Sequence, residues 1–257
     1  TCALPICLQS ANISAKLLRE LGGDAVIGPM LVGMLDAWTE IDANDDIRCA
    51  ILTGAGGTFC SGMDLKSMSG PGNEEVSRRM AEDPDLHWKA LLRHYVLKKP
   101  LIAAVNGHAL AGGFELVLAC DLVVSVDGVK FGIPEVKRGL YAAGGGTRLA
   151  QRIPIAIALE LGLTGDPITP QRAKELGLIN EVVPREELMN AARALAARIT
   201  CNGPLAVQWT KELMWDELGE PDPDKQREAT GKVFSSEDAK EGATAFAEKR
   251  QPNWQSI

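Results

Sequence analysis

Two glutamates in apolar, glycine-rich surroundings are the residues of this chain best suited to acid and base chemistry. Glu115 lies in the run AGGFELVLA, and Glu135 follows a proline and precedes a cluster of three glycines. Burial in apolar surroundings disfavours the ionised form of a carboxyl group, and a second carboxyl group nearby disfavours it further. One member of such a pair can stay protonated while the other is ionised, so the pair can both remove and deliver a proton.

Glycine-rich segments could bring main-chain N–H groups to the same place. The composition around Glu115 is that of a buried helix that begins near Gly112, and the first N–H groups of a helix have no partner inside it. The earlier segment GGTFCSGMDL, residues 56–65, follows an apolar strand and also turns on glycine. Gly62, Gly112 and Gly113 each fit an ordinary turn when taken alone. All three in order, followed by the two glutamates, favour a functional site that a ligand approaches closely.

The composition favours one α/β domain with a smaller C-terminal lobe, because 257 residues that are 46% hydrophobic can bury a sizeable core. The net charge of −7 argues against nucleic acid and anionic membranes as partners, since both require a basic surface. Apolar runs such as residues 114–126 are shorter than the ~20 residues of a membrane-spanning helix. We therefore expect no membrane or nucleic-acid partner.

The cysteines and histidines indicate neither disulfides nor a metal site. Six cysteines are scattered without a CxxC pair and no signal peptide is visible, which favours a reducing, cytoplasmic location. Three histidines lack the spacing of metal ligands, so no metal is expected. Cys60 has no base beside it in the sequence and is expected to pack rather than react. His108 lies near the glycine-rich segments, but a lone histidine in a turn is more often structural.

The hydrophobic pattern predicts strands that alternate with helices, which is typical of a parallel sheet with right-handed crossovers. Helical spacing is evident between Met30 and Ile41, and an interrupted helix is predicted over 74–95. Short apolar runs predict strands at Ile47–Thr53, Leu101–Val105, Asp121–Val126 and Asn180–Val183. Further helices are predicted at 149–163, 170–176, 185–199, 204–218 and 235–250.

Together the three glycine and glutamate segments resemble the crotonase (enoyl-CoA hydratase/isomerase) superfamily. The segment EGATAFAEKRQPNW, residues 241–254, is similar to the usual C-terminal ending of that family. The resemblance covers residues 24–257 and implies an α/β fold, a crotonase-like spiral of ββα units with a C-terminal helical oligomerisation lobe. It places the crotonase core at 24–199 and the helical lobe at 200–257, and it implies a homotrimer or a dimer of trimers.

Residues 1–23 depart from this pattern. The family opens with a β-hairpin whose second strand ends in an Asn-Arg-Pro-like turn, and neither that alternating pattern nor that turn is present here. The first six residues, TCALPI, also look like translated sequencing-adapter DNA. We therefore treat 1–23 as an atypical segment. If its first residues do derive from an adapter, the native N-terminus has been lost or replaced.

The resemblance assigns catalytic roles to four residues. It implies that the N–H groups of Met63 and Gly112 hold the thioester oxygen as negative charge develops on it. It also implies that Glu115 orients and deprotonates a water molecule and that Glu135 protonates the alpha carbon. The implied reaction is the hydration of a 2-enoyl-CoA to a 3-hydroxyacyl-CoA, without a cofactor beyond the coenzyme A of the substrate.

Four more residues are expected to contact the substrate. By the same motif, Ser61 and Leu65 line the adenine and pantetheine channel. Ala143 stands where hydratases of the family commonly have a glycine, and its N–H is expected to touch the catalytic water. Lys249 matches a basic position that often reaches the coenzyme A of a neighbouring subunit, although a lysine at a helix end also complements the helix dipole.

Several alternatives remain open. Glu135 fits a solvated loop residue paired with Lys137 or Arg138. Within the family, the chain also fits a double-bond isomerase or a specialised enzyme for a carnitine-like or branched acyl group. A different class of protein, one that binds acyl-CoA without turnover, would show stabilisation by the ligand and no product.

Overall fold

The structure is a computed structural model that describes residues 6–8, 28–55, 57–63, 73–219, 228, 230–233 and 235–255. Its centre is a five-stranded sheet in the order β1-β2-β3-β5-β7, in which β2, β3, β5 and β7 are parallel. These strands are β1 (Ile6–Leu8), β2 (Ala50–Thr53), β3 (Leu101–Val105), β5 (Leu122–Val126) and β7 (Glu181–Val183). A second, two-stranded sheet pairs β4 (Ala109–Leu110) with β6 (Phe131–Gly132). The predicted parallel sheet is confirmed.

The helices follow the predicted order, with breaks at prolines. The predicted helix over 74–95 is two short helices on either side of Pro84, and the one over 149–163 breaks at Pro154 because proline cannot donate a helical hydrogen bond. The helices are α1 (Gly28–Ala43), α2 (Glu74–Glu82), α3 (Leu86–Ala90), α4 (Gly112–Ala119), α5 (Leu149–Arg152), α6 (Ile155–Thr164), α7 (Pro170–Glu175), α8 (Leu188–Thr200), α9 (Pro204–Asp216) and α11 (Glu237–Glu248). Short 3-10 turns form η2 (Pro134–Arg138), η3 (Gly146–Arg148) and η4 (Arg185–Glu187).

The N-terminal segment contributes a strand that the sequence did not predict. Residues 6–8 pair antiparallel with β2, with Ile6 opposite Leu52. The sequence of 1–23 has no alternating strand pattern, yet these three residues form a strand, since backbone pairing along a sheet edge needs no alternation of side chains. The rest of that segment lies outside the described residues.

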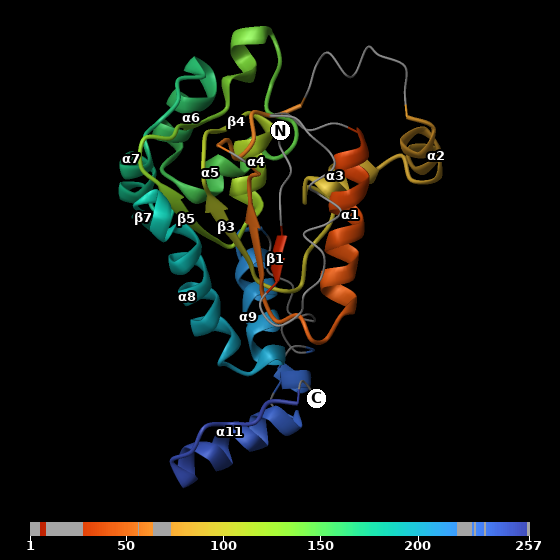
Figure 1. Cartoon of the computed structure of the whole chain (residues 1–257), viewed down its shortest axis with the longest axis vertical. Helices are drawn as coiled ribbons and strands as arrows, with labels where there is room; N and C mark the ends of the chain where they lie inside the picture. The colour runs from red at the N-terminus through yellow and green to blue at the C-terminus, as the bar shows by residue number, and fades with distance from the viewer. Residues whose placement is uncertain are drawn as a thin grey trace.

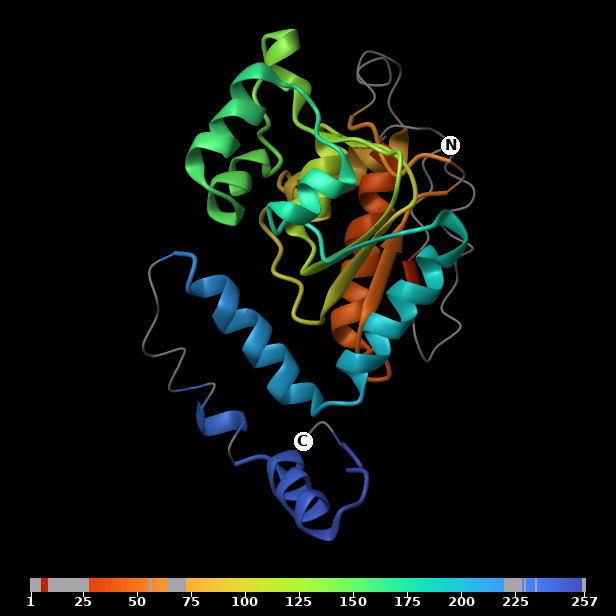
Figure 2. The ribbon, with the colours of Figure 1, turned by 90° about the vertical axis from the view of Figure 1, so that its left-hand side faces the viewer.

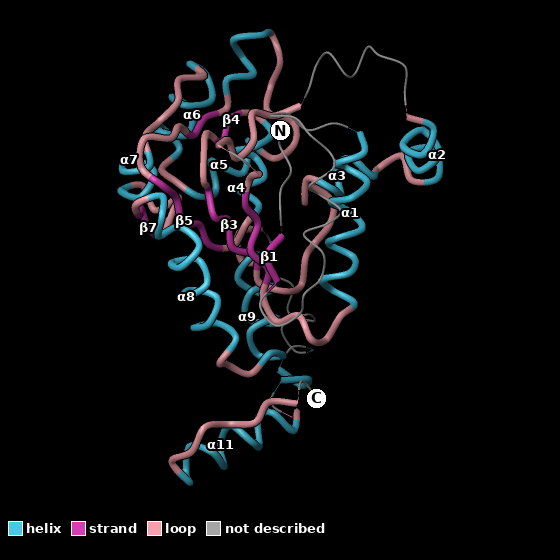
Figure 3. The backbone as a smooth tube through the Cα atoms, in the orientation of Figure 1, coloured by secondary structure: helices cyan, strands magenta, loops and turns pink. Residues whose placement is uncertain are grey.

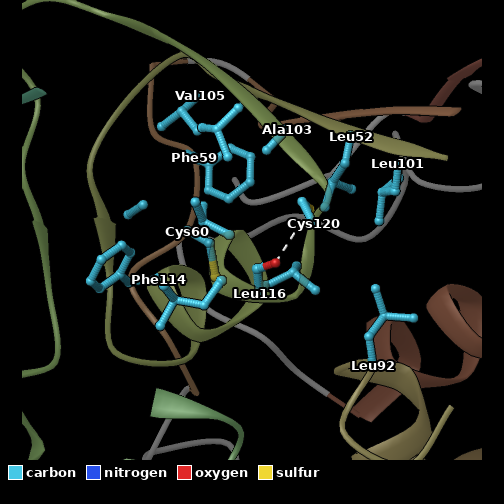
Figure 4. Packing of buried hydrophobic residues seen from close by; sticks show 14 of the residues in the cluster. Leu52, Phe59, Cys60, Leu92, Leu101, Ala103, Val105, Phe114, Leu116 and Cys120 are labelled. Carbon is cyan, nitrogen blue, oxygen red and sulfur yellow. Dashed lines mark hydrogen bonds between the residues drawn. The ribbon is translucent and has the colours of Figure 1, made fainter. Parts of the chain in front are cut away.

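Helices cover both faces of the main sheet. Helix α8 packs against β2, β3 and β5, and Figure 3 shows the strands between α8 and α1. Figure 4 shows Phe114, Leu116 and Cys120, from α4 and its C-terminal end, beside Cys60 and Phe59. All five side chains are fully buried, so α4 is anchored in the core at the point where the glutamate segment begins.

The C-terminal helices lie outside the sheet. In Figures 1 and 2, α9 turns back from the end of α8 toward the level of the core, and α11 lies at the end of the molecule opposite α4 and β4. Pro204 is the one buried residue of α9, although the helix carries several large apolar side chains. No helix in the described part of the chain has the length and apolar character needed to cross a membrane.

A buried charge at the end of α4 connects α9 to the core. Asp121 accepts hydrogen bonds from the Leu101 N–H at 2.7 Å and the Trp215 indole at 2.7 Å, and its carboxylate lies 2.8 Å from Nζ of Lys211. The Lys211 and Asp121 side chains are only 12% and 15% exposed, so water cannot replace these partners. This carboxylate therefore helps to hold α9 against the core, together with the Lys99 carbonyl, which accepts a hydrogen bond of 2.8 Å from Nζ of Lys211.

We expect Asp121→Ala to lower the free energy of unfolding by about 3 kcal/mol, because it leaves an indole N–H and a strand N–H without their acceptor and removes the counter-charge of a buried ammonium, which keeps the Lys99 carbonyl as its acceptor. Urea denaturation would measure the loss. Glu237→Ala removes an exposed partner of Lys240 and serves as the control, with little expected change. A similar small change in both variants would show that α9 is held by other contacts.

Candidate active site

Glu115 lies in the first turn of α4 and is 5% exposed. Its Oε1 accepts a hydrogen bond of 2.9 Å from the N–H of Gly146. Burial raises the pKa of Glu115, and the N–H groups of the glycine cluster partly oppose that rise. The predicted burial of this carboxyl group is confirmed, and the core holds a carboxyl group that is easier to protonate than an ordinary glutamate.

The three glycines at 144–146 allow the chain to wrap around this carboxyl group. A Cβ on Gly144 would lie 2.5 Å from Oε2 of Glu115, and a Cβ on Gly146 would lie 2.3 Å from the Cβ of Ala142. Gly145 has φ = 132°, a backbone conformation that residues with a side chain rarely adopt. Each glycine is thus required for a different steric reason, and their shared effect is to bring main-chain N–H groups to Glu115.

Glu135 lies in η2 and is half-buried. Its Oε2 is buried and has no hydrogen-bond partner among the described residues. Burial raises the pKa of Glu135, and the nearby charge of Arg138 opposes the rise to a smaller extent. Lys137 instead forms an ion pair of 2.6 Å with Asp166. The structure therefore does not show the pairing with Lys137 that was one part of the alternative interpretation of Glu135.

The two carboxyl groups belong to one site. The negative charge of Glu135 is one of the causes that raise the pKa of Glu115. Glu135 and Gly146, the residue that donates to Glu115, both line a cavity of about 280 Å³ between η2, η3 and α6. A proton can therefore be held by one carboxyl group while the other is ionised on the same side of a bound molecule.

The predicted oxyanion donors lie beside Glu115. Gly112 is the first residue of α4, so its N–H has no acceptor within the helix. A Cβ on Gly112 would lie 3.7 Å from Oε2 of Glu115 and 4.0 Å from the main-chain nitrogen of Met63. On the other side, a Cβ on Gly62 would lie 3.2 Å from the nitrogen of Gly112. The two peptide segments meet without side chains between them.

A strained residue fixes the direction of α4. Ala111 precedes the helix with φ = 52° and ψ = −130°, a conformation that glycine adopts more easily than alanine. Its N–H donates to the Gly132 carbonyl at 2.9 Å, and its own carbonyl accepts from Phe114 and Glu115 at 2.9 and 3.0 Å. These bonds hold the strained peptide in place, and the turn aims the start of α4 at the site.

The structure places the remaining predicted residues as follows. Ser61 and Met63 are exposed beside the site, and Leu65 lies outside the described residues. The N–H of Ala143 donates to the carbonyl of Tyr141 at 2.9 Å instead of facing a position for water. Lys249 is exposed at the end of α11 and is not brought to the glutamates of its own chain (Figure 1).

Sequence reasoning missed the donor to Glu115. The sequence predicted a contact with the catalytic water for Ala143, just before the glycine cluster. It predicted none for Gly146, which donates the hydrogen bond to Glu115. A signal was available, since a run of glycines offers N–H groups to a buried carboxylate without steric hindrance. Within the described residues, no three His, Cys, Asp or Glu side chains cluster closely enough to hold a metal ion. His108 accepts the N–H of Lys130 at 3.0 Å, which agrees with a structural role.

Comparison with known proteins gives consistent results. A family model described as enoyl-CoA hydratase/isomerase matches residues 23–256. The chain is 44% identical over 242 residues to the enoyl-CoA hydratase EchA19 of Mycobacterium tuberculosis, covering 93% of this chain and 91% of the relative. It is 40% identical over 256 residues to the carnitinyl-CoA dehydratase of Proteus mirabilis, covering 94% of this chain and 89% of the relative.

The fold is likewise similar to solved structures. The crystal structure of an enoyl-CoA hydratase from Mycobacterium tuberculosis H37Rv superposes with a TM-score of 0.79 at 46% identity, covering 91% of this chain and 90% of that chain. The similarity extends over most of each chain and is not confined to one motif.

The raised pKa of Glu135 makes stability depend on pH in a defined direction. The folded protein keeps this carboxyl proton to a higher pH than the unfolded chain, where the pKa is about 4.3. The charge at Glu135 therefore destabilises the fold as pH rises through the window above that value. We expect Glu135→Gln to raise Tm relative to the wild type at about pH 8, with the gain shrinking toward about pH 4.

Thermal unfolding across that pH range would measure the effect. Glu160→Gln, on α6, is the matched control and should follow the wild type at each pH. A gain for Glu135→Gln that grows on acidification would contradict the assigned direction of the shift.

Proposed function

Because the chain belongs to the enoyl-CoA hydratase/isomerase family, we propose that it adds water to a 2-enoyl-CoA to give a 3-hydroxyacyl-CoA. The enzyme class expected from the sequence, an enoyl-CoA hydratase, is the one that its named relatives carry. The observation that most supports the proposal is the pair of carboxyl groups, Glu115 and Glu135, both with raised pKa. Glu135 lines a cavity together with Gly146, whose N–H donates to Glu115. Two such groups are what water addition requires.

In the proposed mechanism, the thioester oxygen binds between the N–H groups of Met63 and Gly112. Ionised Glu115 removes a proton from water as the oxygen attacks the beta carbon. The electrons of the double bond move onto the thioester oxygen, where the two donors stabilise the enolate by about 3 kcal/mol each. Protonated Glu135 then delivers its proton to the alpha carbon. One water is added and no electrons are gained or lost, so the chemistry itself requires no redox cofactor.

The acyl group is proposed to be apolar. The relative from Proteus mirabilis is named for carnitinyl-CoA, whose acyl group carries a quaternary ammonium. Glu135 is the one carboxylate among the described residues that line the cavity, and the mechanism already uses it. A branched or longer hydrocarbon therefore fits better than a cationic group. A double-bond isomerase needs only one base to move a proton, which leaves the second buried carboxyl group without a role.

We also propose a homotrimer or a dimer of trimers. The support is the unburied apolar side of α9, which borders a mainly apolar groove of about 640 Å³ next to Leu122 and Ile199. Met214 of α9 is 68% exposed in the single chain. In such an assembly Lys249 would reach the coenzyme A of a neighbouring subunit. The cytoplasmic location remains a prediction from the sequence.

The first test is the loss of the conjugated enoyl-thioester absorbance of 2-enoyl-CoA substrates. We expect the wild type to consume them, and Glu115→Gln and Glu135→Gln each to lower kcat by about 10²-fold or more, because each substitution removes one proton-transfer step. Both variants should still bind the substrate. Tight binding with no product from the wild type at any chain length would favour an acyl-CoA-binding protein or an isomerase.

A second test uses the adjacent glycines at the start of α4. A Cβ on Gly112 meets only ordinary contacts, so Gly112→Ala should fold with an unchanged Tm and lose at least about 10²-fold in kcat/KM, since the methyl group fills the space between the donors and Glu115. Gly113→Ala is the contrasting variant. Its Cβ would lie 2.2 Å from the Cys60 carbonyl oxygen, so it should mainly lower Tm. Full activity of Gly112→Ala would argue against this position for the thioester.

A further inference from the structure

The cavity that Glu135 and Gly146 line is larger than a short acyl group requires. Its volume is about 280 Å³, which is roughly nine times the ~30 Å³ that one water molecule occupies in the liquid. A crotonyl group has a single carbon beyond the beta carbon that receives the water. The chemical character of the side chains that line the rest of the cavity indicates which ligand group binds there.

Among the described residues that line the cavity, Glu135 is the only one with a carboxyl, amine or guanidinium group. Apolar side chains from η2 and the residue before it, from α5 and from α6 form most of the lining: Ile133, Val136, Leu149, Ile155, Leu159 and Leu163. Such a surface binds hydrocarbon and does not compensate a charged ligand for the loss of its hydration.

The apolar lining continues outward along α6. Ile155, Leu159 and Leu163 recur every four residues, so they lie on one side of the helix. They are 57%, 49% and 72% exposed, and Tyr141 across the cavity is 73% exposed. The cavity therefore opens from Glu135 onto an apolar surface, along which a chain of carbons can extend.

A glycine inside α6 keeps this cavity open. Gly162 lines the cavity two residues before the end of the helix. A Cβ at this position would meet only Ile133 Cδ1, at an ordinary 3.7 Å, so neither packing nor backbone conformation requires glycine. Glycine is unfavourable inside a helix. Its presence here costs helix stability and leaves room for a ligand.

We propose that this cavity binds the distal part of an acyl chain longer than four carbons, and that Gly162 sets the size of acyl group accepted. The inference rests on the proposed hydratase function, because that function places the reacting carbons between Glu115 and Glu135. Each methylene that leaves water for the cavity is expected to raise kcat/KM about fourfold. A substrate of about eight carbons should therefore be strongly preferred over crotonyl-CoA.

The experiment compares kcat/KM for crotonyl-CoA and 2-octenoyl-CoA. We expect the wild type to prefer 2-octenoyl-CoA by at least about tenfold. Gly162→Leu fills the cavity and should reduce that preference at least about tenfold. Ala150 of α5 also lines the cavity, so Ala150→Leu provides a second variant should the first fail to fold. Glu160→Leu adds the same side chain to α6 outside the cavity and should keep the wild-type preference.

Binding of saturated butyryl-CoA and octanoyl-CoA, measured by calorimetry, separates this inference from the proposed function. One outcome would be that no enoyl-CoA is hydrated, that octanoyl-CoA binds more tightly than butyryl-CoA, and that Gly162→Leu abolishes this difference. The hydratase proposal would then be wrong, and the proposal of an acyl-binding cavity would be supported. If hydration proceeds equally well with both chain lengths, the function stands and this inference is wrong. An unchanged preference together with a smaller particle mass for Gly162→Leu would instead assign the apolar surface to a second copy of the chain.

Discussion

The site depends on a carboxyl group that the fold keeps out of water. Glu115 is held in the apolar end of the core by a main-chain N–H and not by a basic side chain. A neighbouring lysine or arginine would stabilise the charge and lower the pKa, leaving a poor proton acceptor. A peptide N–H orients the carboxyl group while burial keeps its pKa raised. The glycine cluster, the burial of α4 and the position of η2 can all be understood as ways of meeting this requirement.

The same requirement sets how α4 is attached. The helix begins against the main chain of Cys60, where only glycine fits at position 113, and Phe114 and Leu116 bury its sides. Strain at Ala111 is balanced by hydrogen bonds on both sides of its peptide. A helix fixed this rigidly places its first N–H and its glutamate together, so the charge on the substrate oxygen and the proton on water are controlled by one element.

The sequence predicted the parts that local physics determines. The parallel sheet follows from alternating apolar segments, and the start of α4 and the burial of Glu115 follow from AGGFELVLA alone. Contacts between distant segments could not be derived in the same way. The bond from Gly146 to Glu115 joins residues 31 positions apart, and the pairing of Ile6 with Leu52 needs no alternating pattern. Ala143 was assigned a contact by position within a motif, whereas a two-residue turn directs its N–H to Tyr141.

The glycines of the site differ in what they reveal. Gly113 and Gly144 are forced by neighbouring atoms, and Gly145 is forced by its backbone angle, so each would be needed for folding even without a substrate. Gly112 and Gly162 are under no such constraint, because a Cβ at either position meets only ordinary contacts. A glycine that neither packing nor backbone conformation requires indicates that the missing side chain leaves space for a ligand. One of these two lies at the reacting end of the site and the other along the apolar cavity, which is consistent with a single elongated ligand occupying both.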